Sequence, residues 1–179
     1  MNRVKPDFSP EQIAAALGQI HCPGSLNEFS AAMAQPWRNV IRHRREIDQK
    51  DLPVPSTPVD WYSLGRRPAK DSGSPARSVA YACGDFFIQD AGSLLALAVA
   101  GADGDGLRGK TVCDLCAAPG GKASALLEAV TNCDIESRGF VLANEVIRNR
   151  VAPLQLNLAR AGSDCFAVSS LDPEKLADQ

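Results

Sequence analysis

The stretch from Thr111 to Lys122, T-V-C-D-L-C-A-A-P-G-G-K, constrains the fold more than any other part of the chain. Its first half is apolar and begins with β-branched residues, which predicts a short buried strand. The strand cannot continue through Pro119 and the two glycines, because proline lacks an N–H donor and glycine adopts backbone angles that other residues resist. Residues 123–130 are rich in helix formers with apolar residues at helical spacing. Strand, glycine turn and helix in this order direct backbone N–H groups towards a bound ligand.

Two familiar glycine-loop motifs do not match this turn. A phosphate-binding P-loop needs a glycine where this chain has Cys116 and a Ser or Thr where it has Ala123. The dinucleotide fingerprint G-x-G-x-x-G is absent as well, since Gly120 and Gly121 are adjacent and stand alone. The turn therefore argues against nucleoside triphosphates and NAD as ligands.

Residues 114–122, with the sequence D-x-C-A-A-P-G-G-K, resemble motif I of the Nop/Sun family of RNA 5-methylcytosine methyltransferases. Within this family the bacterial RsmB and RsmF types look most similar. The family usually has Thr after the lysine, and this chain has Ala123. The resemblance implies a Rossmann-like α/β fold and S-adenosylmethionine as the cofactor. It assigns cofactor binding to the residues of the turn, which are Cys116, Ala117, Ala118, Pro119, Gly120, Gly121 and Lys122.

A second cofactor contact is expected at Glu145. Residues 139–143 predict another buried strand, and Glu145 follows its C-terminal end. A carboxylate in this position can accept both ribose hydroxyls of a nucleoside cofactor. The alternative is an acid that stabilises the N-terminus of the next helix, predicted over residues 146–161. Because the glycine turn lies one strand earlier, we favour the ribose role.

Three further stretches resemble the same family. Residues 143–162 resemble motif II with its following helix, which adds Arg150 to the cofactor residues. Asp172 follows a third predicted strand at residues 165–168 and resembles the aspartate that binds the adenine side of the cofactor. Before the glycine turn, the polar residues Gln89, Asp90 and Ser93 precede a predicted helix and resemble motif X of the family.

Composition fits a globular protein with an uneven charge distribution. The chain has 179 residues, of which 45% are hydrophobic and 22% charged, and its net charge is −2. Residues 1–80 hold 11 basic and 8 acidic residues, net +3, and residues 81–179 hold 8 and 13, net −5. RNA contacts are therefore expected in the first half. Since there is neither a signal-peptide core nor an apolar run of membrane length, we expect a cytoplasmic protein that does not enter a membrane.

The first half divides into helical, basic and proline-rich parts. Helices are predicted over residues 9–17 and after Ser25, where Glu28 completes a capping box. An exposed strand or basic element follows at residues 39–47, and it loosely resembles a strand in the small α/β domain that precedes the catalytic domain in Nop/Sun enzymes. Its arginines are candidates for phosphate contact or simply a solvated face, with neither favoured: Arg42, Arg44 and Arg45.

Residues 51–78 carry five prolines and predict a linker or irregular crossing segment, with Trp61 and Tyr62 packed as an anchor rather than stacked on bases. We therefore expect a small α/β domain with a proline-rich connection over residues 1–80, and the cofactor half of a methyltransferase domain over residues 81–179.

No metal site is expected. Six cysteines in a chain without signs of secretion predict reduced thiols. Cys113 and Cys116 have zinc-ligand spacing, but a second ligand pair is missing and both histidines lie far away in the sequence. Small buried residues at a strand end are the favoured interpretation of this pair.

The catalytic cysteines of the family have no counterpart here. In Nop/Sun enzymes they lie in D-A-P-C-S-G and T-C-S motifs, and this chain contains neither a Pro-Cys nor a Thr-Cys pair. We expect the first three strands of a sheet of order 3-2-1-4-5, with one edge of the first strand bare. The leading interpretation is the N-terminal part of an RNA cytosine-5 methyltransferase, acting on rRNA or tRNA, that is either truncated or completed by another polypeptide and is inactive alone. The alternatives are a non-catalytic RNA- or cofactor-binding accessory protein and a methyltransferase with another acceptor.

Overall fold

The computed structural model describes residues 12, 25, 27, 28, 31 and 39–178. The chain divides into two compact units, Met1–Trp37 and Arg38–Gln179, and every element below belongs to the second. The helix predicted over residues 9–17 lies, apart from Gln12, outside the described residues. The predicted capping box is confirmed, because Glu28 N donates to Ser25 Oγ at 3.3 Å and Ser25 N donates to Glu28 Oε2 at 2.7 Å. Among the described residues no helix is long and apolar enough to cross a membrane.

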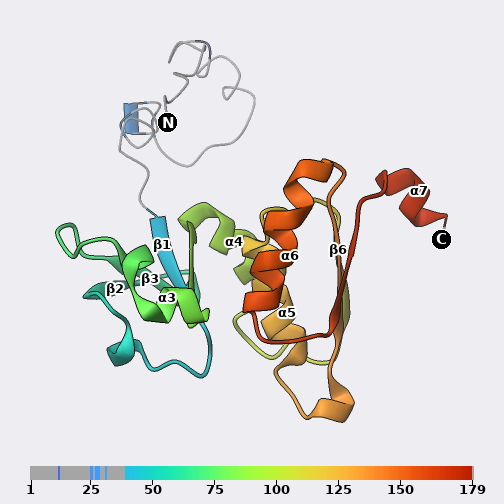
Figure 1. The fold of residues 1–179 in the computed structure, drawn as a ribbon. Helices are drawn as coiled ribbons and strands as arrows, with labels where there is room; N and C mark the ends of the chain where they lie inside the picture. The colour runs from blue at the N-terminus through green and yellow to red at the C-terminus, as the bar shows by residue number, and fades with distance from the viewer. Residues whose placement is uncertain (1–11, 13–24, 26, 29–30, 32–38, 179) are drawn as a thin grey trace. The chain divides into compact units, whose positions relative to one another are not determined.

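An antiparallel sheet of order β2-β3-β1-β4 opens the second unit (Figure 1). Its strands are β1 (Asn39–His43), β2 (Ser56–Val59), β3 (Tyr62–Pro68) and β4 (Phe86–Asp90). Short helical elements lie between them: η1 (Gln49–Asp51), η2 (Pro75–Arg77) and α3 (Val79–Cys83). Both faces of the sheet are covered. Val40, Val59 and Tyr62 pack against later helices, and Ile41 and Phe86 pack against Leu52, Val54 and α3.

Two expectations for this region are wrong. Residues 39–43 form a strand, but a buried central one, since β1 pairs with both β3 and β4. Residues 51–78 contain two strands rather than an irregular segment. Their prolines are compatible with pairing because Pro58 lies on the edge strand β2 and Pro68 ends β3, where a missing N–H costs little. The division predicted at residue 80 stays a prediction, and the sheet itself spans it.

Strand β4 runs directly into α4 (Ala91–Val99). Asp90 caps this helix, because its Oδ1 accepts from Ser93 N at 3.1 Å. Leu94 and Leu97 of α4 are buried against the antiparallel sheet and the next helix. The polar entry that the sequence indicated is therefore the N-terminus of a packed helix.

A parallel sheet of order β5-β6-β7 follows, joined by helices in the sequence β5, α5, β6, α6, β7. Its elements are β5 (Thr111–Asp114), α5 (Gly121–Thr131), η3 (Ile135–Ser137), β6 (Phe140–Asn144), η4 (Arg148–Arg150), α6 (Val151–Arg160), β7 (Phe166–Ser169) and α7 (Pro173–Ala177). The three predicted strands and their order are confirmed. The predicted helix 146–161 begins later, at Val151, because residues 148–150 form a 3-10 turn and Pro153 fits only the first turn of a helix.

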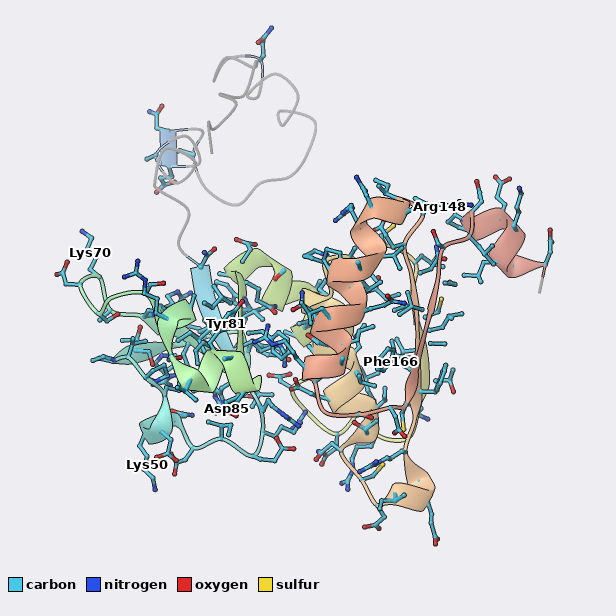
Figure 2. The ribbon with its side chains drawn as sticks, in the orientation of Figure 1. Lys50, Lys70, Tyr81, Asp85, Arg148 and Phe166 are labelled. Atoms are coloured by element: carbon cyan, nitrogen blue, oxygen red, sulfur yellow. The ribbon has the colours of Figure 1, made fainter. Side chains whose placement is uncertain are left out.

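Helices α5 and α6 lie on the same face of this sheet (Figure 1). Phe166 of β7 points to that face (Figure 2), where Val141, Ala143, Leu154 and Leu158 are fully buried. The opposite face is open: Thr111 and Cys113 of β5, Phe140 of β6 and Ala167 of β7 are exposed. Within the described residues β5 pairs with β6 alone, so the bare edge expected for the first strand is confirmed.

Candidate functional site

The glycine turn between β5 and α5 requires glycine at residue 120. Gly120 is the N-cap of α5 and has φ 108° and ψ 4°, a left-handed conformation that side chains disfavour. A Cβ at this position would lie 3.0 Å from the Cβ of Asn157. The turn is closed by Gly120 N, which donates to the Ala117 carbonyl at 2.8 Å, and it contains a cis Ala118–Pro119 peptide.

Three neighbouring elements hold this turn. Ala117 N donates to the Asn144 carbonyl of β6 at 2.9 Å. Arg150 Nη2 donates to the Ala118 carbonyl at 2.7 Å, and Asn157 Nδ2 donates to the Pro119 carbonyl at 2.7 Å. The turn is thus fixed at successive residues by β6, η4 and α6, and its shape depends on the parallel unit as a whole.

Glu145 and Arg150 lie together beside the turn. The Glu145 side chain is almost wholly buried; its Oε1 accepts from Ile147 N at 2.9 Å and its Oε2 lies 3.3 Å from Arg150 Nη1. Arg150 therefore bridges this carboxylate and the glycine turn. A carboxylate offers about four acceptor positions, so Glu145 retains acceptors for a ligand while it also binds the local backbone.

Asn144 joins the C-terminal ends of all three parallel strands. Its Oδ1 accepts from Ser169 Oγ at 2.7 Å and from Leu171 N at 3.1 Å, and its Nδ2 donates to the carbonyls of Leu171 at 2.9 Å and Leu115 at 3.4 Å. The sequence did not predict that Asn144 would link the three strand ends. The available signal was a polar side chain at the end of a buried strand, a position that requires hydrogen-bond partners.

Two buried oxygens at the same edge of the sheet have no partner. They are Asp114 Oδ2, at the end of β5, and Ser170 Oγ, just after β7. In open α/β sheets ligands bind outside the carboxyl ends of the strands. The unpaired oxygens and the buried carboxylate at this edge can accept hydrogen bonds from hydroxyl or ammonium groups of a ligand.

The remaining predicted cofactor residues lie on the surface. Cys116, Pro119 and Lys122 are exposed, and so is Asp172, whose Oδ1 caps α7 by accepting from Glu174 N at 3.1 Å. Asp172 follows Leu171, so its backbone lies at the edge that Asn144 organises. The expectation that Cys113 and Cys116 are buried is wrong, since both are exposed. Among the residues that the structure describes, no group of three or more His, Cys, Asp or Glu side chains could hold a metal ion.

A pocket of about 300 Å³ adjoins the glycine turn. Gln89, Asp90 and Ser93 line this pocket together with Pro119, Gly121 and Lys122 of the glycine turn. The stretch that resembles motif X and the stretch that resembles motif I therefore share one cavity. Gln89 Nε2 donates to Ser93 Oγ at 3.2 Å, and Gln89 Oε1 is buried without a partner. The cavity therefore offers a free acceptor next to the turn.

The three candidate arginines have different environments. Arg42 is fully buried and paired with Glu128 at 2.7 Å, so its predicted phosphate contact is corrected: the guanidinium is not accessible to RNA. Arg45 donates to the carbonyls of Ala102 and Gly104 at 2.9 and 2.8 Å. Arg44 is partly exposed and lies 3.5 Å from Glu46. Contact of Arg44 and Arg45 with RNA stays a prediction.

The chain is similar to known methyltransferases over part of their length. It is 31% identical over 159 residues to ribosomal RNA small subunit methyltransferase F of Escherichia coli O1:K1 / APEC, covering 83% of this chain and 32% of that protein. The protein of the same name from Photobacterium profundum is 30% identical over the same shares. The chain thus spans about a third of the length of these curated relatives. No family model matches it.

Among solved structures, a methyltransferase homolog protein from Pyrococcus horikoshii superposes with a TM-score of 0.72 at 24% identity, covering 86% of this chain and 50% of that one. Together with the parallel sheet and the glycine turn, this likeness defines the Rossmann-like methyltransferase fold, here with its first three strands. Within that class the chain is similar to proteins named ribosomal RNA small subunit methyltransferase F over about a third of their length, in keeping with its resemblance to the Nop/Sun family.

Proposed function

We propose that this chain forms the S-adenosylmethionine-binding half of an RNA cytosine-5 methyltransferase whose substrate is ribosomal RNA. The observation that carries the proposal is the bridge by Arg150 between the buried Glu145 carboxylate and the glycine turn, since it sets a hydroxyl acceptor beside a helix N-terminus. The rRNA methyltransferase relatives support RNA as the acceptor.

The cofactor, when bound, supplies a sulfonium methyl group. In the proposed site the glycine turn and the N-terminus of α5 receive the amino-acid end, because their backbone N–H groups suit a carboxylate. Glu145 accepts the ribose hydroxyls, Arg150 holds its carboxylate in place, and Asp172 lies on the adenine side.

Calorimetry with S-adenosylmethionine tests this proposal. We expect the native chain to bind the cofactor, and Glu145→Ala to bind at least about tenfold more weakly, since the loss of hydrogen bonds to a charged group costs about 1.5–3 kcal/mol. Glu136→Ala, which removes an exposed carboxylate from η3, is the matched control and should bind as the native chain does. Equal affinity of the Glu145 variant and the control would remove Glu145 from the site.

Methyl transfer requires more than this site. Attack on carbon 6 of cytosine needs a thiolate beside the flipped base, and none of the six cysteines lies in a motif that assigns it this role. We therefore propose that a polypeptide with the family's two cysteine motifs completes the sheet at the bare edge of β5. Transfer of labelled methyl groups to rRNA by the 179-residue chain alone would contradict this requirement.

The alternative is a non-catalytic accessory protein that binds RNA or the cofactor. The two proposals separate when a polypeptide carrying those motifs is added. Restored methylation of cytosine supports the enzyme half, and binding without methylation supports the accessory role. Both fit a cytoplasmic protein that contacts RNA through Arg44 and Arg45.

A further inference from the structure

Arg42 occupies an unusual place for an arginine. It lies in the central strand β1 and has no exposed surface. Among the described residues it is one of the largest side chains that are fully buried. Its Nη1 donates to Glu128 Oε2 at 2.7 Å and its Nη2 donates to Ser124 Oγ at 3.0 Å, both on α5. The guanidinium also lies over the Phe87 ring, with Cζ 4.7 Å from the ring centroid. The antiparallel sheet is thus tied to the helix that begins at the glycine turn.

The hydrogen bonds around Ser124 have a fixed direction. An arginine donates and never accepts, so the Ser124 oxygen must accept from Arg42. The single hydroxyl proton is then free to point only to another acceptor, and the Gly121 carbonyl lies 3.1 Å away. Arg42, Ser124 and Gly121 therefore form a directed series of hydrogen bonds that ends in the first residue of α5.

The end of this series lies in a peptide unit that also carries a backbone donor of the glycine turn. The Gly121 carbonyl and the Lys122 N–H belong to one planar peptide unit, so holding the carbonyl also orients the N–H. N–H groups in the first turn of a helix lack intrahelical partners and point towards the ligand. Gly121, Ser124 and Glu128 share one face of α5 because they are three and four residues apart, and Arg42 meets that face.

We propose that Arg42 is a positioning residue for the cofactor site: through Ser124 it fixes the Gly121–Lys122 peptide of the glycine turn, and thereby the affinity of that turn for its ligand. The proposal rests on the proposed function for the identity of the ligand. The proposal explains why a guanidinium is buried here and donates from both terminal nitrogens to side chains of α5. An apolar side chain would fill the same space at a lower desolvation cost.

Two variants and one matched control test the positioning role. Arg42→Lys keeps the charge beside Glu128 but loses the planar fork that reaches both Glu128 and Ser124. Ser124→Ala removes only the relaying hydroxyl and inserts a good helix former. Arg66→Lys is the control, because Arg66 is an arginine of the same antiparallel sheet whose hydrogen bonds, to Ser56 Oγ and the Ser56 carbonyl, lie away from α5.

The readouts are 15N relaxation of the Gly121 and Lys122 amides without ligand, and calorimetry with S-adenosylmethionine at a temperature where every variant is folded. We expect lower order parameters at both amides and at least about fivefold weaker binding in Arg42→Lys and Ser124→Ala. Arg66→Lys should leave both readouts unchanged, even where it lowers the unfolding temperature.

The outcomes separate this inference from the proposed function. Native order parameters and native affinity in Ser124→Ala would overturn the positioning role and leave only a structural ion pair. If the native chain fails to bind S-adenosylmethionine, the proposed ligand is wrong, but the relaxation measurement still decides whether Arg42 orders the turn.

Discussion

Asn157 Nδ2 donates to the Pro119 carbonyl at 2.7 Å, and the Cβ of the same asparagine would lie 3.0 Å from a side chain at residue 120. One residue of α6 therefore both fastens the glycine turn and excludes side chains from it. The shape of the glycine turn therefore depends on packing against α6 as much as on the turn's own sequence. This dependence makes its contributions to stability measurable one residue at a time.

Asn157→Ala should lower the free energy of unfolding by about 1 kcal/mol, since it leaves the Pro119 carbonyl without this donor. Urea denaturation followed by circular dichroism measures the change. The control is Gln155→Ala on the same helix, because Gln155 is exposed and its truncation should stay within about 0.5 kcal/mol. Equal effects of the two variants would show that the hydrogen bond contributes nothing measurable.

Gly120→Ala should destabilise the chain by about 2 kcal/mol or more, because it adds a close contact to a left-handed conformation. Gly73→Ala separates these causes: Gly73 has φ 76° but would meet nothing within 4 Å. That variant should lose about 1 kcal/mol from conformation alone. Thermal unfolding of both proteins gives the difference, and a Gly120 variant no less stable than the Gly73 variant would rule out the steric part.

Tyr62 gives a pH-dependent prediction. Burial raises the pKa of Tyr62 to about 12, above its ordinary value of 10.0. The protonated phenol is therefore favoured in the folded chain, so its contribution is complete below pH 10 and is lost as the pH rises towards 12. Over this range the native chain should lose about 2 kcal/mol more stability than Tyr62→Phe.

The phenylalanine variant also has a prediction at neutral pH. The Tyr62 hydroxyl is buried without a hydrogen-bond partner, so its removal should leave stability unchanged or slightly higher. Urea titrations of both proteins between pH 7 and pH 12 check the two statements together. Parallel stability curves above pH 10 would show that Tyr62 does not carry the alkaline loss.

Glu128→Ala should cost about 3 kcal/mol, because it leaves the buried Arg42 charge without its carboxylate. Glu136→Ala removes an exposed carboxylate and should stay within about 0.5 kcal/mol. Chemical denaturation of both variants against the native chain measures the contrast. A small loss for Glu128→Ala would mean that water reaches Arg42 in the variant.

The open face of the parallel sheet predicts self-association. Phe140, Thr111, Cys113 and Ala167 are exposed there, and an exposed apolar face with an unpaired edge favours contact with another chain. Sedimentation should show concentration-dependent association of the native chain and less of it for Phe140→Lys. Val79→Lys, a change at an exposed valine of α3, is the control and should associate like the native chain.

The glycine turn and the three parallel strands were predictable because each depends on local sequence: apolar runs set the strands, and Pro119 with Gly120 sets the turn. The strands at residues 56–68 were not, since prolines count against a strand unless its place at the sheet edge is known. The place of Asn144 at the strand ends likewise depends on long-range contacts.

Arg42 shows the same limit for charge. A run of arginines predicts a solvent-facing surface. Nothing in the local sequence indicates that Arg42 pairs with Glu128, which lies 86 residues later in the chain. The role of a charged residue follows from its partner across the fold, which periodicity does not reveal. The position of Glu145 just after β6 was predictable because the apolar run of that strand is local, while its role in binding stays a prediction.

Strand β4 and helix α4 share an uninterrupted backbone, with Asp90 ending one and capping the other. A cleavage at this junction would separate a strand of the antiparallel sheet from a helix that covers the same sheet and touches α5. The two sheets therefore lack a boundary at which either could be expressed alone. We expect residues 38–179 to melt in one cooperative calorimetric transition, with equal van't Hoff and calorimetric enthalpies.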